Sequence, residues 1–71
     1  MRRNIINWDQ VEGRWKEYRG KAQIQWGKLT HDDLDVIKGR RTALEGLLQE
    51  RYGYAKEKVK TVVDSWLSKL Q

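Results

Sequence analysis

Apolar residues recur along this chain at intervals of three and four, the spacing that places side chains on one face of an α-helix. They do so in three stretches, over residues 8–26, 34–52 and 55–70. No stretch sustains the alternation of apolar and polar residues that is typical of a β-strand. The pattern therefore predicts an all-α protein with a helix over about 7–26, a short helix near 31–38, a longer helix near 40–51 and a last helix near 55–70.

Two polar residues lie where helices should begin. Asn7 precedes the first apolar stretch, with Gln10 three residues later, which resembles an N-cap and its reciprocal partner. Thr30 is a good N-cap for the second stretch, and Asp32 and Asp33 follow it in the first turn, where negative charge opposes the positive end of the helix dipole. Both positions support the predicted starts.

Glycines mark the predicted ends and breaks of the helices. Gly27 and Gly53 follow apolar stretches and are expected to end helices in the left-handed conformation. Gly39 is expected to separate the short helix from the longer one. Gly13 lies inside the first predicted helix, where glycine costs about 1 kcal/mol relative to alanine. The sequence leaves open whether Gly13 kinks that helix or breaks it.

The spacing of the six glycines also indicates an internal repeat. They form two trios with a spacing of seven, and the second trio is offset from the first by 26 residues. Superposing residues 7–27 on 33–53 preserves most apolar positions. The identical pairs are Asp9 and Asp35, Gly13 and Gly39, Arg14 and Arg40, Gly20 and Gly46, Gln23 and Gln49, and Gly27 and Gly53. These matches favour a duplication of one helical unit.

The length and composition limit the class of protein. A chain of 71 residues accommodates one small domain, which we place at residues 7–70 after an N-terminal tail at 1–6. Cysteine is absent, so no disulfide or thiolate metal site can stabilise it. No apolar run exceeds two residues, so we expect no export signal, no membrane insertion and a soluble cytoplasmic protein. The net charge of +5 permits contact with anions without specifying one.

Several strings along the chain carry a family resemblance. From residue 7 the chain contains NWDQVEGRWKEYRGK, QWGKLTHDDLDVIKGRR, GLLQERYGYAKEKV and DSWLSKL in that order. The most specific pieces lie at residues 26–30, 32–34 and 49–54. In these strings the chain resembles the CsbD-like family of small bacterial stress-response proteins, over about residues 7–70.

The resemblance implies a fold and a setting without implying a reaction. It implies a bundle of about four helices, similar to two α-hairpins packed crosswise as in SAM-like folds, and this agrees with the repeat. It also implies production under general stress and a cytoplasmic location. The molecular activity of the family is not established. We therefore expect a monomeric protein that acts by non-covalent interaction or protection, with an unidentified protein as its partner.

The residues give no support for catalysis or for a cofactor. A nucleophilic site needs a base beside the nucleophile and a third group to orient the base. His31 with Ser65 or Ser68 is the one combination from which such a site could start, and nothing in the sequence brings these residues together. We expect His31 to be a solvated residue in the first turn of a helix. We predict no enzymatic activity.

A metal site at residues 31–35 is also disfavoured. His31, Asp32, Asp33 and Asp35 could offer ligands to a hard cation, but a calcium loop that begins at Asp33 lacks the required glycine and glutamate. Capping of the helix explains the acidic residues better. We therefore predict no metal.

Aromatic and basic residues raise the alternative of a weak, salt-sensitive nucleic-acid-binding protein. The four tryptophans at positions 8, 15, 26 and 66 could stack on bases, but they lie on apolar stripes, and a core without phenylalanine needs large side chains. Arg41 lies at a stripe position and could place its stem along an aromatic ring. The candidate nucleic-acid contacts are Arg14, Lys16, Arg19 and Lys21, which point around much of the helix with acidic residues among them.

Ile24 is the apolar residue that the predicted core explains least. On a helical wheel it lies opposite Trp15, on the side of Gly13, Gly20 and Gly27. An apolar residue above small ones can form a shallow groove for a partner helix, so these four residues form a candidate partner-binding face. Two alternatives stay open: Ile5 and Ile6 fold back over Ile24, or Ile24 is an exposed apolar residue without a function.

Overall fold

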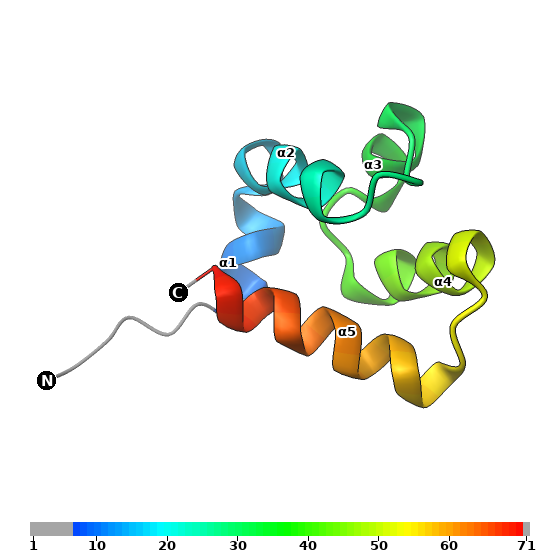
Figure 1. Cartoon of the computed structure of the whole chain (residues 1–71). Helices are drawn as coiled ribbons and strands as arrows, with labels where there is room; N and C mark the ends of the chain where they lie inside the picture. Colours follow the sequence, from blue (N-terminus) through cyan, green and yellow to red (C-terminus); the bar gives the residue numbers. More distant parts are fainter. Residues whose placement is uncertain (1–6, 71) are drawn as a thin grey trace, which may run out of the picture.

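The computed structural model describes residues 7–70, which fold into five α-helices (Figure 1). The predicted tail at 1–6 lies outside the described residues. The helices are α1 (Trp8–Gly13), α2 (Trp15–Gln25), α3 (His31–Ile37), α4 (Arg41–Tyr52) and α5 (Lys56–Lys69). Among the described residues there is no strand, so the predicted all-α class and the helical bundle are confirmed.

The first predicted helix is two helices, which makes five in place of the expected four. Arg14 leaves the helical conformation, with φ −120° and ψ 39°. It is the C-cap of α1 and the N-cap of α2. Its N–H donates to the carbonyl of Gln10, and its carbonyl accepts from the N–H of Tyr18. Gly13, next to it, is a poor helix former, so α1 breaks there at low cost.

The architecture repeats as the sequence does. In each half a short helix precedes a long one, and the 26-residue offset places α2 at 41–51, almost the span of α4. The two breaks lie against each other. An added Cβ on Gly39 would lie 2.8 Å from Cα of Glu12, and the indole N–H of Trp8 donates to the carbonyl of Gly39 at 2.7 Å. The two halves of the expected duplication therefore meet at the breaks between their helices.

Most capping predictions are confirmed. Asn7 and Thr30 cap α1 and α3, each in a reciprocal capping box, with Gln10 and Asp33 as their partners. Gly53 ends α4 in the left-handed conformation, with φ 73°. Gly39, together with Lys38, separates α3 from α4 with positive φ, as expected.

The prediction for Gly27 is wrong, since its φ is not positive. Helix α2 ends at Gln25, and Trp26 follows with φ −123°. The chain then turns sharply, because the N–H of Leu29 donates to the carbonyl of Trp26 at 3.0 Å. This turn brings Trp26 and Leu29 into the core, so burial of these two side chains ends the helix without a left-handed residue.

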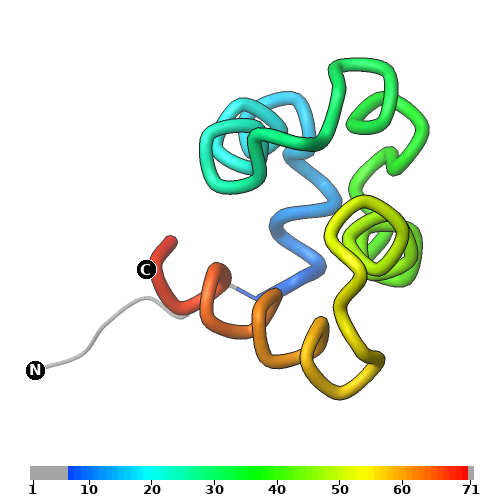
Figure 2. Tube along the Cα trace, turned by 45° about the vertical axis from the view of Figure 1, so that its right-hand side comes forward, coloured from blue at the N-terminus to red at the C-terminus, as the bar shows by residue number. Residues whose placement is uncertain are grey.

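The helices surround one core. In Figure 2, α2, α3, α4 and α5 lie around the middle of the molecule and α1 crosses from α5 to α2. The expected core positions of the tryptophans are confirmed for Trp15, Trp26 and Trp66, while Trp8 is half-buried against the core. The remaining core residues are Val11, Tyr18, Ala22, Leu29, Leu34, Ile37, Leu44, Leu48, Val59 and Val63.

Arg41 joins three helices at the edge of this core. Its guanidinium carbon lies 6.0 Å from the centre of the Trp8 ring, so the charged end of Arg41, and not its stem as expected, lies over an aromatic ring. The charged end also pairs with Glu45 at 2.8 Å and with Asp64 of α5 at 2.7 Å. Arg41 therefore links α1, α4 and α5.

Candidate functional site

The structure does not assemble the catalytic combination that the sequence raised. His31 begins α3 and is exposed, and Oδ2 of Asp35 lies 3.9 Å from its Nε2. Ser65 and Ser68 lie on α5, at the opposite end of the view in Figure 1. Within residues 7–70 no three metal-ligating side chains come together. A hydroxyl without a neighbouring base is a weak nucleophile.

Asp33, considered above as a metal ligand, has a structural role. Arg51 of α4 donates to both of its carboxylate oxygens, from Nη2 at 2.8 Å and from Nε at 3.1 Å. The bond from Arg51 and the bond from the backbone of Thr30 lower the pKa of Asp33 from 3.8 to about 2. Asp33 thereby joins the start of α3 to the end of α4. Sequence reasoning identified its capping role and missed Arg51, 18 residues away.

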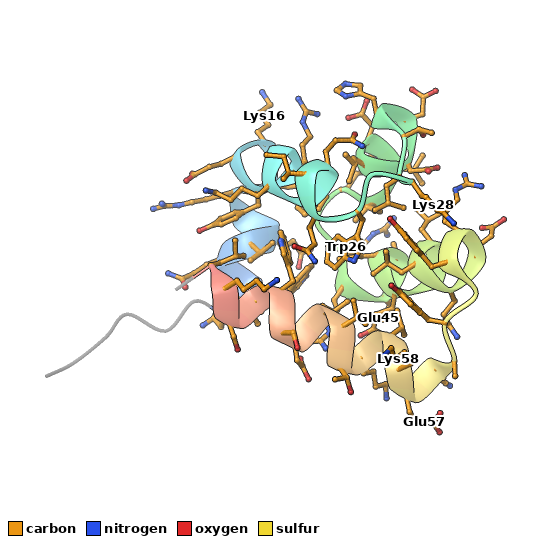
Figure 3. The ribbon with its side chains drawn as sticks, viewed as in Figure 1. Lys16, Trp26, Lys28, Glu45, Glu57 and Lys58 are labelled. Carbon is orange, nitrogen blue, oxygen red and sulfur yellow. The ribbon has the colours of Figure 1, made fainter. Side chains whose placement is uncertain are left out.

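The four candidate nucleic-acid contacts of the first repeat do not form an uninterrupted basic face. Arg14, Lys16 and Lys21 are exposed, and Lys16 points away from the rest of the molecule (Figure 3). Arg19 instead donates to the carboxylate of Asp35 at 2.8 Å, so part of its charge is offset within the protein.

The candidate partner-binding face is exposed where the structure describes it. Ile24 is 87% exposed, and an added Cβ would meet nothing within 4 Å at Gly13, Gly20 or Gly27. The break at Arg14 places Gly13 on α1, so the helical wheel of α2 no longer relates it to Ile24. The alternative in which residues 5 and 6 cover Ile24 lies outside the described residues.

A cleft of about 360 Å³, which sequence reasoning missed, opens between the last residues of α2, the end of α4 and one side of α5. Figure 3 shows Trp26 between these three helices. The cleft is lined by Gln25, Trp26, Tyr52, Tyr54, Lys58, Thr61, Val62, Ser65, Trp66 and Lys69. Four of these ten residues are aromatic, two are lysines and none is acidic. We call it the aromatic cleft.

Two stacked tyrosines belong to the aromatic cleft. The rings of Tyr52 and Tyr54 are nearly parallel, with centres 5.3 Å apart and planes at 5°. Gly53 between them turns the chain through a left-handed conformation, which lets side chains two positions apart stack at the end of α4. The backbone N–H of Lys28 donates to the Tyr52 hydroxyl at 3.2 Å, and Nζ of Lys28 lies 5.1 Å from the centre of the ring.

Two tryptophans contribute buried ring surface to the cleft. Trp26 and Trp66 are 2% and 3% exposed, and their ring centres are 5.1 Å apart. The indole N–H groups of Trp8 and Trp15 donate to backbone carbonyls. Within residues 7–70 neither the indole N–H of Trp26 nor that of Trp66 donates to a protein acceptor, in contrast to Trp8 and Trp15.

The charged residues that line the aromatic cleft are positive. Lys58 and Lys69 belong to its lining, and Lys28 lies against Tyr52. Figure 3 shows Lys28 and Lys58 on either side of Trp26. Glu45, also labelled there, is paired with Arg41. The cleft thus combines ring surface, lysine ammonium groups and indole donors, which suits an anion that carries a flat or apolar part.

Comparison with known proteins identifies the family. The model of the CsbD-like family matches residues 9–61, three quarters of the chain. The chain belongs to the CsbD-like family. This is the stress-response family that the strings at 26–34 and 49–54 indicated. No solved structure matches this CsbD-like protein, so its likeness to SAM-like folds rests on the sequence resemblance alone.

Curated relatives cover nearly the whole chain. The UPF0337 protein RPA4217 of Rhodopseudomonas palustris is 58% identical over 66 residues, 93% of this chain and all of the relative. The UPF0337 protein ECA0631 of Pectobacterium atrosepticum is 56% identical over 86% of this chain and 88% of its own. The UPF0337 protein YjbJ of Escherichia coli O6:H1 is 51% identical over the same shares. Within the described residues, no helix of this CsbD-like protein is long and apolar enough to cross a membrane.

Proposed function

We propose that this CsbD-like protein acts in the bacterial stress response by binding another molecule non-covalently, without catalysing a reaction. The observation that carries the proposal is the aromatic cleft, which collects ring surface, lysines and indole donors from three helices and is lined by no acidic residue. Clefts in which aromatic side chains and polar groups converge are typical of binding sites.

The chemistry of the cleft supports binding over catalysis. Its hydroxyl groups belong to Thr61, Ser65 and two tyrosines, and its lining contains no histidine, carboxylate or cysteine. The hydroxyl of Thr61 donates to the carbonyl of Glu57 within its own helix. A serine in such surroundings has no carboxylate or imidazole to take its proton, whereas lysines attract a bound anion and the rings pack against its flat or apolar part.

Survival under stress tests this proposal. A bacterium that lacks the gene is complemented with the wild-type chain, with a cleft variant carrying Tyr54→Ala and Lys58→Gln, or with a control carrying His31→Ala and Ser68→Ala. We expect the control to restore survival and the cleft variant to fail at equal protein level. Loss of survival with the control alone would show that a reactive side chain, and not the cleft, carries the function.

The face around Ile24 is the proposed contact for an unidentified protein partner. Its support is the 87% exposure of Ile24 together with the open space at Gly20 and Gly27, which leaves room for another backbone. Crosslinking in stressed cells, with Ile24→Lys in parallel, tests it. One abundant protein captured by the wild type and lost in the variant supports the face, and equal capture by both contradicts it. We also propose a monomeric cytoplasmic protein, which light scattering and cell fractionation test.

Weak, salt-sensitive binding to nucleic acid is the second candidate function. It is favoured by the net charge of +5 and by the lysines of the aromatic cleft. Binding through phosphates releases counterions, so affinity for random nucleic acid should fall steeply between two salt concentrations. Binding that does not change with salt would contradict this candidate.

A further inference from the structure

The aromatic cleft carries a more specific assignment, which rests on the proposed non-covalent function. We propose that it binds one nucleotide of a single-stranded nucleic acid, with the base against the stacked tyrosines and the flanking phosphates near Lys58 and Lys69. The basic residues of α2, which the sequence favoured for nucleic acid, are not the main site. Proteins that bind single strands combine a basic groove with aromatic side chains on which bases stack.

The first argument is the state of the two buried indoles. Trp26 and Trp66 are at least 97% buried, and their N–H groups have no acceptor among residues 7–70. Both residues line the cleft. A buried donor without a protein acceptor offers a hydrogen bond to an incoming acceptor. Phosphate oxygens and base carbonyls are such acceptors.

The second argument is the tyrosine pair. The rings of Tyr52 and Tyr54 lie parallel, and the bond from Lys28 to the Tyr52 hydroxyl fixes the orientation of the pair. Both residues are only half-buried. An ordered, partly exposed stack of rings can extend by one more flat ring at little cost in side-chain entropy. A nucleobase has this shape, and an acidic peptide offers no such ring at each residue.

The third argument concerns charge and size. The lining contains two lysines and no carboxylate, which selects for an anion. The volume of about 360 Å³ lies near the lower end of pockets for small ligands, which run from roughly 300 to 1,000 Å³. One nucleotide, and not a helical segment, matches that scale. Bases in a duplex are stacked inside it and cannot enter, so the cleft selects a single strand.

Fluorescence anisotropy tests the assignment. The probes are labelled twelve-residue oligothymidylate and oligouridylate, the matching DNA duplex, adenosine monophosphate as competitor and a labelled polyglutamate peptide. We expect both single strands to bind at low salt, the duplex to bind at least tenfold more weakly, and the mononucleotide to compete only at much higher concentration. A preference between the two strands then identifies DNA or RNA as the source.

Variants locate the site. Tyr54→Leu keeps apolar bulk and removes the ring, and should weaken single-strand binding by about five- to a hundredfold. Lys58→Gln with Lys69→Gln should lower the salt slope of the affinity by about 1.4, since each phosphate contact contributes about 0.7 for single strands. The matched control, Lys16→Gln with Lys21→Gln, removes the same charge from α2 and should change the affinity less than twofold. Circular dichroism checks that each variant folds.

Several results would overturn the assignment. These are equal weakening by the α2 control and the cleft variants, equal binding of duplex and single strand, competition by the mononucleotide at the concentration of the oligomer, or tighter binding of polyglutamate. These results concern the nucleotide assignment and not the proposed non-covalent function. If the cleft variant loses stress survival while no oligonucleotide binds, non-covalent action at the cleft stands and the nucleotide assignment fails.

Discussion

Glycine-to-alanine substitutions at positions 39, 46 and 53 distinguish the effects of backbone strain, close packing and helix propensity on the stability of this fold. Gly39 and Gly53 both have positive φ, 82° and 73°, so alanine at either position must adopt a strained backbone. They differ in their surroundings. A Cβ on Gly53 would meet nothing within 4 Å, whereas a Cβ on Gly39 would lie 2.8 Å from Cα and 3.1 Å from the carbonyl oxygen of Glu12. Gly46 is a solvent-exposed residue between the two ends of α4, with open space around it and no such backbone strain.

The magnitudes follow from these surroundings. Left-handed backbone costs an L-residue about 1–2 kcal/mol, which is the expected loss for Gly53→Ala. Gly39→Ala adds overpacking against a backbone that cannot rotate away, about 1–3 kcal/mol more, for a total of about 2–5 kcal/mol. A domain of this size has only about 3–5 kcal/mol of net stability, so this variant should be close to unfolded. Gly46→Ala should gain about 1 kcal/mol from helix propensity.

Urea denaturation followed by tryptophan fluorescence and by circular dichroism measures the three free energies of unfolding. The expected order of stability is Gly46→Ala above wild type, then Gly53→Ala, then Gly39→Ala. The matched comparison is between the two strained positions. Equal losses at Gly39 and Gly53 would refute the close approach of the two helix breaks, and with it the account of how the halves of the duplication meet.

Three further substitutions test single contacts. Asp33→Asn should destabilise the protein at neutral pH because it removes the carboxylate that Arg51 holds. The pKa of Asp33 is lowered to about 2, so the wild type should lose this contribution to stability as the pH falls from 3.8 toward 2. Acid titration of the variant should therefore show a smaller loss of stability over that range. Trp15→Ala should cost about 3–5 kcal/mol in urea denaturation, because the ring is buried and its N–H donates to the carbonyl of Leu34 at 2.8 Å; a wild-type midpoint would place the ring outside the core. Thr30→Ala should lower stability by about 1 kcal/mol through loss of the α3 capping box, and an unchanged thermal midpoint would contradict that role.

The helices were largely predictable because their signals are local. The period of apolar residues and the caps at Asn7, Thr30 and Gly53 act within one turn of the chain, and the structure agrees with each. The sequence left open whether Gly13 kinks or breaks the first helix, and the structure shows a break at the next residue, Arg14. Besides the low helix propensity of Gly13, this break involves a tertiary contact that the sequence does not show, since the turn at Gly39 packs against Glu12. The end of α2 was misjudged for a similar reason, because burial of Trp26 and Leu29 decides where that helix stops.

The candidate site was much less predictable. The aromatic cleft combines residues from 25–26, 52–54 and 58–69, and only the packing of α2, α4 and α5 brings these together. In the sequence, Trp26 and Trp66 are members of apolar stripes, and core burial is indeed their main role. What the sequence could not indicate is that two of the four indole N–H groups would lack an acceptor among residues 7–70. The string at 49–54, with two tyrosines around a glycine, supported the family resemblance and the end of a helix, and it did not indicate a site.

The four indole N–H groups also provide the most direct test of the cleft as the binding site. Each gives its own signal in a nitrogen–proton correlation spectrum, assigned by single tryptophan-to-phenylalanine variants, during titration with oligothymidylate or oligouridylate. The account predicts that the signals of Trp26 and Trp66 shift with saturation. It also predicts that those of Trp8 and Trp15, which donate to the carbonyls of Gly39 and Leu34, stay in place. Saturable binding that leaves Trp26 and Trp66 unmoved, or that shifts all four alike, would contradict it.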